Sequence, residues 1–198
     1  MFLNKAMLKK LIKTSFKWEG LTVGRIYGGL VVAGGHWITW TEDGYIPNWL
    51  KAAVMEYTGE LPKPEYAFKA KKNEPIQYEI ADNSLYDLPS MYQKAIYAYK
   101  VTPVVIERGG YDALRVLQQN STMKMLAIHE DKYKMIDLKE LGEENPPSGP
   151  ASTTPNGGVL IFKNEHSAYA FTSLSDVYGT ADTIMEHIEV IDFSKEDI

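Results

Sequence analysis

Cysteine is absent from this chain of 198 residues, which excludes disulfide bonds, thiolate metal sites and cysteine nucleophiles. Long apolar runs are lacking too, since no window approaches the 18 consecutive apolar residues of a membrane-spanning helix. Lysines interrupt the first residues every few positions, which leaves no apolar stretch typical of a secretory signal. We therefore expect a cytoplasmic protein with no membrane partner.

The sequence also lacks the linear motifs of nucleotide and hydrolase chemistry. There is no GxxxxGK[ST], GxGxxG, HExxH or GxSxG. Acid pairs such as Glu42-Asp43, Glu130-Asp131 and Glu143-Glu144 fall in expected loops, where solvated carboxylates are the default. We predict no enzymatic activity, no catalytic residue and no cofactor.

Three of the four histidines, His36, His129 and His166, lie at or beside an expected hairpin turn. A three-histidine metal site is one interpretation. The other is that polar residues belong at hairpin tips and that the three tips do not converge. We favour the second interpretation and predict no metal site.

What the sequence does contain is a series of strand pairs rich in β-branched and aromatic residues. Each pair is joined by a polar or glycine-containing turn, as hairpins require. The five expected hairpins join Leu30–Ala33 to Trp37–Trp40, Tyr66–Phe68 to Ile76–Ile80, Val104–Ile106 to Ala113–Leu117, Met123–Ile128 to Tyr133–Ile136, and Val159–Phe162 to Ala168–Phe171.

Helical patterns separate these strands. We expect helices over Asn4–Lys17, Trp49–Tyr57, Ser90–Ala98 and Ala181–Ile188. The predicted fold class is α+β: mainly antiparallel β hairpins with three or four helices, with clamp-like repeated half-domains as an open alternative. Residues 142–158 carry four prolines and four glycines and are expected to form a flexible loop. The roughly 40 residues after it are too few to fold alone, so we expect a single body over 1–198, whose lobes (about 1–95 and 96–198) could be similar.

The N-terminal helix has the most informative pattern. Its five lysines, Lys5, Lys9, Lys10, Lys13 and Lys17, fall within an arc of about 140° when each residue advances by 100°. Apolar residues occupy the other side of the helix, and the segment holds no acid. Outside it, 16 lysines and arginines stand against 26 acids, a balance of −10. A cationic stripe of this kind attracts a polyanion, although a lysine face can also serve solubility alone.

A basic amphipathic helix followed by paired strands, a second helix and more strands resembles the DNA sliding clamp family of polymerase processivity factors. The resemblance is one of pattern and covers roughly the first 90 residues. It implies a sheet on the outside of a ring and helices on the inside, with lysines turned toward a duplex. The matching segments are Phe2–Asn4, Ala6–Lys17, Gly29–Thr41, Asn48–Gly59 and Tyr66–Ile80. The segment Ala181–Glu189 departs from the pattern, since it carries acids and no lysine.

Three function classes follow. The leading hypothesis is a non-enzymatic, clamp-like protein that contacts the backbone of duplex DNA through the five lysines, without base readout. The second is a protein-interaction or assembly subunit, with a homo-oligomer or another protein as partner. The third is a small hydrolase or sugar-binding protein that uses Trp37, Trp40, Tyr45 and Trp49.

Overall fold

The computed structural model of the chain describes residues 1–80, 86–107, 109, 113–137, 145–174 and 180–195. The described α-helices are α1 (Lys5–Trp18), α2 (Asn48–Thr58), α3 (Leu88–Gln93), α4 (Glu130–Tyr133) and α5 (Thr180–Ile188). The described strands are β1 (Leu21–Ile26), β2 (Gly29–Gly34), β3 (Trp37–Glu42), β4 (Tyr66–Ala70), β5 (Gln77–Ile80), β6 (Tyr97–Glu107), β7 (Ala113–Gln119), β8 (Met125–His129), β9 (Ser148–Ser152), β10 (Val159–Lys163) and β11 (Ser167–Thr172).

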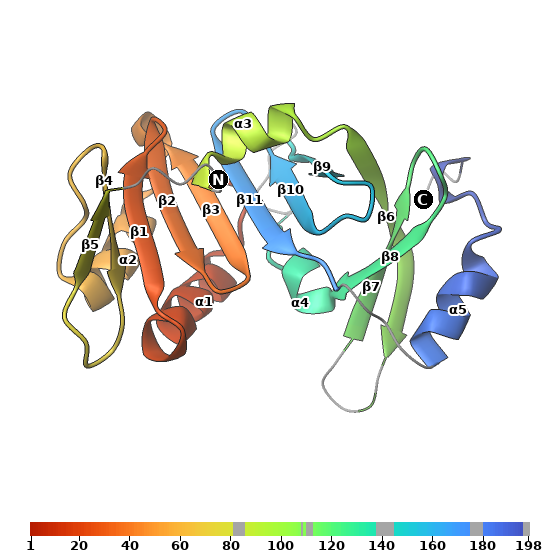
Figure 1. Cartoon of the computed structure of the whole chain (residues 1–198), viewed down its shortest axis with the longest axis horizontal. Helices are drawn as coiled ribbons and strands as arrows, with labels where there is room; N and C mark the ends of the chain where they lie inside the picture. The colour runs from red at the N-terminus through yellow and green to blue at the C-terminus, as the bar shows by residue number, and fades with distance from the viewer. Residues whose placement is uncertain (81–85, 108, 110–112, 138–144, 175–179, 196–198) are drawn as a thin grey trace.

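All of these strands belong to one antiparallel sheet (Figure 1). Its order is β5-β4-β1-β2-β3-β11-β10-β9-β6-β7-β8, so strands from 1–80 occupy one side and strands from 97–172 the other. The seam between the two sides is the β3–β11 pair, in which Thr39 lies opposite Tyr169. The predicted fold class, an α+β set of hairpins with clamp-like repeated half-domains, is therefore wrong. Pairings between distant strands join the hairpins into a single sheet that dominates the short helices.

Four of the five expected hairpins are confirmed, as the pairs β2–β3, β4–β5, β6–β7 and β10–β11. The fourth, from Met123–Ile128 to Tyr133–Ile136, is wrong. Strand β8 pairs with β7 instead, and the residues expected to form its turn become helix α4. Ile136 forms a bridge with Leu3. Within 142–158, expected to be a loop, Ser148–Ser152 form β9, while 142–144 lie outside the described residues.

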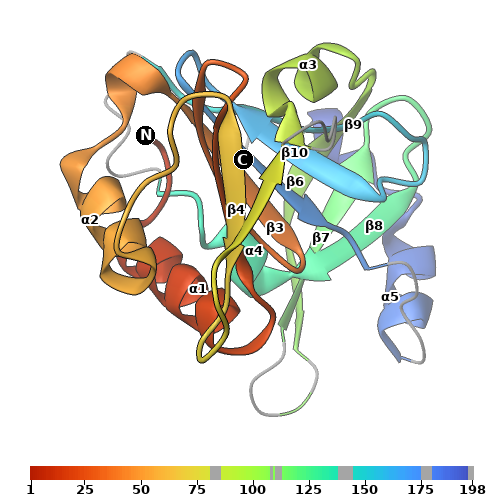
Figure 2. The same cartoon turned by 60° about the vertical axis from the view of Figure 1, so that its left-hand side comes forward.

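The helices lie on both faces of the sheet (Figures 1 and 2). Helices α1 and α2 pack side by side on one face, where Leu8, Ile12, Leu50 and Val54 belong to the largest core cluster. Helix α3 covers β10 and β11 on the opposite face. Because side chains alternate along each strand, these strands also have apolar side chains on that face. Helix α5 packs through Ala181 and Met185 on a third cluster over β7 and β8.

The helix predicted over Ser90–Ala98 is shifted: α3 ends at Gln93, and β6 begins at Tyr97. The helix predicted over Ala181–Ile188 is confirmed as α5. The early helix boundary has a local cause. Asp87 caps α3 by accepting a hydrogen bond from the Ser90 backbone N–H at 3.1 Å, and Pro89 follows within the first turn.

Tyr169 in β11 is fully buried, and its hydroxyl has no hydrogen-bond partner among the described residues. Burial raises the pKa of Tyr169 above its ordinary value, and the nearby charge of Asp131 raises it further. The fold thus favours the neutral phenol. Because the folded-state pKa is the higher one, this contribution to stability is complete below about pH 10 and is lost as the pH rises further.

We expect Tyr169→Phe to stabilise the protein by about 1 kcal/mol at neutral pH, because it removes a buried hydroxyl that makes no hydrogen bond. The gain should grow above pH 10, since the folded Tyr169→Phe protein has one buried tyrosine fewer to keep protonated. The free energy of unfolding in urea, measured at neutral and at alkaline pH, checks this. A variant less stable than the native protein at neutral pH would show that the hydroxyl is satisfied.

Candidate nucleic-acid interface

Helix α1 begins and ends with well-formed caps. The side chain of Asn4 accepts a hydrogen bond from the Met7 backbone N–H at 3.1 Å, and the backbone N–H of Glu19 donates to the Ser15 carbonyl at 3.1 Å. The segment before the helix forms backbone hydrogen bonds with residues 135–137. The Asn4 N–H donates to the Met135 carbonyl, and the Asp137 N–H donates to the Phe2 carbonyl. These caps and ties fix the start and the direction of the helix.

The buried side of α1 rests on the hairpin β2–β3. The Trp37 indole N–H donates to the Ser15 hydroxyl at 3.2 Å, and both residues are buried. Gly34 stands beside this hydrogen bond, and a Cβ at that position would collide with the Ser15 hydroxyl and the Trp37 indole. A glycine is therefore required for the helix to approach the hairpin this closely.

The outer side of α1 carries the five lysines, and the structure leaves all of them exposed. None of them forms an ion pair with any residue that the structure describes. The ammonium of Lys5 lies 6.0 Å from the centre of the Trp49 ring, and that of Lys17 lies 4.4 Å from the Trp18 ring. The sequence-predicted lysine face thus forms a stripe about 20 Å long on a helix that rises 1.5 Å per residue.

Neighbouring elements add further charge beside α1. Helix α4 lies along one flank, where Met7, Lys10 and Leu11 face Asp131 and Lys132 across a small hollow of about 90 Å³. At the other end of the helix, the backbone N–H of Lys72 donates to the Phe16 carbonyl at 2.9 Å. Sequence reasoning missed both neighbours, because each comes from a segment distant in the chain.

The three turn histidines do not meet. His36 and His129 line one hollow of about 430 Å³ together with Asp131 and Lys132. His166 lies elsewhere, where its Nδ1 is 2.7 Å from a Glu42 carboxylate oxygen and its ring stacks on Tyr45 with centroids 3.4 Å apart. Among the residues that the structure describes, no group of three or more histidines and acids could hold a metal ion.

The aromatic residues between 37 and 49 divide between core and surface. Trp37 and Trp40 are 3% and 6% exposed, and the Trp40 indole N–H donates to the Tyr27 carbonyl at 3.2 Å. Trp49 is half-buried against α1, and Tyr45 is exposed on His166. Two of the four rings considered for a sugar platform are therefore core residues.

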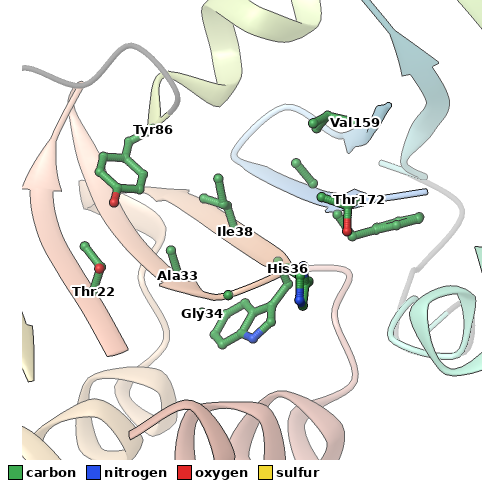
Figure 3. A pocket seen from close by; sticks show the side chains of 12 residues that line it. Thr22, Ala33, Gly34, His36, Ile38, Tyr86, Val159 and Thr172 are labelled. Carbon is green, nitrogen blue, oxygen red and sulfur yellow. The ribbon is translucent and has the colours of Figure 1, made fainter. Parts of the chain in front are cut away.

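A separate apolar hollow of about 220 Å³ opens on the opposite face of the sheet from α1 (Figure 3). Small and apolar side chains from β2, β3 and β11 form its floor, and Tyr86, before α3, stands at its rim. Its lining consists of Thr22, Ala33, Gly34, Gly35, His36, Trp37, Ile38, Tyr86, Val159, Ala170, Phe171 and Thr172. Among the described residues that line this hollow, His36 is the one with an acidic or basic side chain.

Exposed aromatic side chains also gather at the β5 edge of the sheet. Tyr66 and Tyr78 are 54% and 67% exposed on the neighbouring strands β4 and β5. With Leu61, Pro62 and Lys63 they line a hollow of about 440 Å³. The Tyr78 hydroxyl donates to a Glu60 carboxylate oxygen at 2.8 Å, and this hydrogen bond is the main reason that the pKa of Tyr78 is raised. If the protein is instead a protein-interaction subunit, these exposed aromatic residues are the candidate contact surface.

Comparison with known protein families, curated proteins and solved structures finds no match to this chain. In the described part of the chain, no helix combines the length and the apolar character needed to cross a membrane. The assignment of a function therefore depends on the geometry of the chain itself.

Proposed function

We propose that this protein is a non-enzymatic binding protein that contacts the backbone of duplex DNA through the lysine face of α1, in the cytoplasm. The observation that supports this most directly is that all five lysines are exposed on one helix of an otherwise acidic chain, with no ion pair to any residue that the structure describes. Five cations held within one helix raise the local concentration of a polyanion and neutralise phosphates without reading bases.

The placement of α1 supports contact with a phosphate backbone through one helix, without the repeated half-domains that a sliding clamp would have. The helix lies on one face of an antiparallel sheet next to α2 (Figure 2), and its five lysines are exposed. Its caps and its buried face hold it in one orientation. A charged face that is preorganised in this way loses little conformational entropy on binding, beyond that of the lysine side chains themselves.

If five phosphates are neutralised, the logarithm of the affinity for duplex DNA should fall against the logarithm of the salt concentration with a slope of about −4 to −5. Removing Lys9 and Lys13 together, as Lys9→Ala with Lys13→Ala, should flatten that slope by roughly 2 and weaken binding for every sequence alike. Fluorescence anisotropy on a labelled duplex at several salt concentrations measures both quantities.

The matched control removes two exposed lysines elsewhere, as Lys63→Ala with Lys94→Ala, which changes the net charge by the same amount. The control should leave the slope nearly unchanged, because neither residue is on α1. Binding that ignores salt, or an equal effect of the two double variants, would reject the lysine face as the contact surface.

A further inference from the structure

Trp18 is the last residue of α1 and is 65% exposed. The other three tryptophans are buried or half-buried, so the exposure of Trp18 is particular to this position. Indole is among the largest apolar side chains and adds 150–250 Å² of burial when it is covered. At 65% exposure, most of the surface of this indole is available to a ligand.

The surroundings of Trp18 are cationic. The ammonium of Lys17 lies 4.4 Å from the centre of the Trp18 ring, within the range of a cation–π interaction. Lys10, Thr14 and Lys17 follow one another at helical spacing along the same flank of α1, and all three are exposed. Lys72 is brought beside this end of the helix by its backbone hydrogen bond to Phe16.

The acid that follows Trp18 in the sequence, Glu19, is engaged with another part of the chain. The carboxylate of Glu19 accepts a hydrogen bond from the Gly35 backbone N–H at 3.0 Å, which turns it toward the β2–β3 turn. Glu74, on the same side, is paired with Lys71 at 2.9 Å. An exposed aromatic ring at the end of a row of cations is the combination that holds single-stranded nucleic acid, in which phosphates follow the charge and bases stack on the rings.

We propose that Trp18 is a base-stacking site, and that the protein therefore binds unpaired nucleotides in addition to duplex backbone. This inference rests on the proposed function and specifies its ligand further. In a duplex the faces of the bases are already stacked on each other, so only a single strand or an unpaired end can place a base on the indole. Lys10, Lys17 and Lys72 would contact the phosphates on either side of that base.

The test uses the full chain with oligothymidylate of about 20 nucleotides and a duplex of the same length. Trp18→Ala should weaken binding to the single strand about five- to 150-fold, the range that the loss of one stacked base implies. Binding to the duplex should stay within about twofold, and Trp18→Phe should recover most of the single-strand affinity. Binding of the single strand should also quench tryptophan fluorescence in the native protein and not in Trp18→Ala.

Trp49→Ala is the matched control, because Trp49 lies beside Lys5 at the opposite end of the same helix and is half-buried. Equal losses for single strand and duplex, or no loss in Trp18→Ala, would overturn the stacking site. If duplex binding still depends on Lys9 and Lys13 in that case, the proposed function survives alone. If neither nucleic acid binds, both the function and the stacking site are rejected.

Discussion

Glu130→Ala is expected to destabilise the protein by about 3–5 kcal/mol, the usual result of leaving one partner of a buried ion pair unpaired. Glu130 receives two hydrogen bonds from Arg115, at 2.7 and 2.8 Å, and the two side chains are only 9% and 15% exposed. The guanidinium also donates to the Thr102 carbonyl at 3.2 Å and lies over the Tyr133 ring. Without the carboxylate, its charge would remain buried. Chemical denaturation followed by circular dichroism measures the loss.

Two further variants separate this effect from a general loss of charge. Asp131→Ala changes an exposed neighbouring acid and should shift stability by no more than about 0.5 kcal/mol. Replacing both partners, as Arg115→Met with Glu130→Met, should cost less than Glu130→Ala alone, since no buried charge remains. A double variant that is less stable than the single one would contradict this account of the pair.

Trp37→Ala is expected to cost about 3–5 kcal/mol, the range for deleting a fully packed aromatic side chain. Trp37 is 3% exposed, and its ring supports α1 through the core and through the hydrogen bond to Ser15. The change would remove the ring and leave the Ser15 hydroxyl without its donor. Because α1 rests on this ring, the proposed function predicts that affinity for duplex DNA falls along with the free energy of unfolding.

Trp18→Ala supplies the comparison, since it is the same chemical change on the same helix at an exposed position. It should alter the free energy of unfolding by no more than about 0.5 kcal/mol. Ser15→Ala, which removes only the hydrogen-bond acceptor, should fall between the two at about 1–3 kcal/mol. A Trp37→Ala variant as stable as Trp18→Ala would show that the helix does not depend on this contact.

The parts of the fold that sequence reasoning found are those encoded by neighbours in the chain. Gly34-Gly35 between two strand-like stretches predicted the pair β2–β3, and the helical spacing of lysines and apolar residues predicted α1. The seam between β3 and β11 joins residues more than 120 positions apart, and no local pattern reports such a pairing. Helix α4 was missed because four residues are too few to show a helical period, and because its first residue, Glu130, pairs with Arg115 on the separate strand β7.

The candidate site divides in the same way. The lysine arc follows from helical spacing alone and needs no tertiary information. The exposure of Trp18 does not follow from helical spacing. On a helical projection Trp18 falls on the apolar side, near Leu11, which lies seven residues earlier. It is exposed because α1 ends there, with the chain turning into β1 at Leu21. In the sequence, the glycine that follows Glu19 is typical of a helix end and indicates that α1 stops beside this indole.

The tie between the start of the chain and residues 135–137 has a consequence for biosynthesis. Phe2 and Leu3 are completely covered in the folded protein, yet their backbone partners are Asp137 and Ile136. A ribosome adding 5–20 residues per second needs about 7–27 s to synthesise the residues from Phe2 to Asp137. Strands β1 to β4 can assemble earlier, while the lead into α1 waits with its apolar side chains uncovered. During that interval Phe2 and Leu3 are open to chaperones, because the residues that cover them have not yet been made.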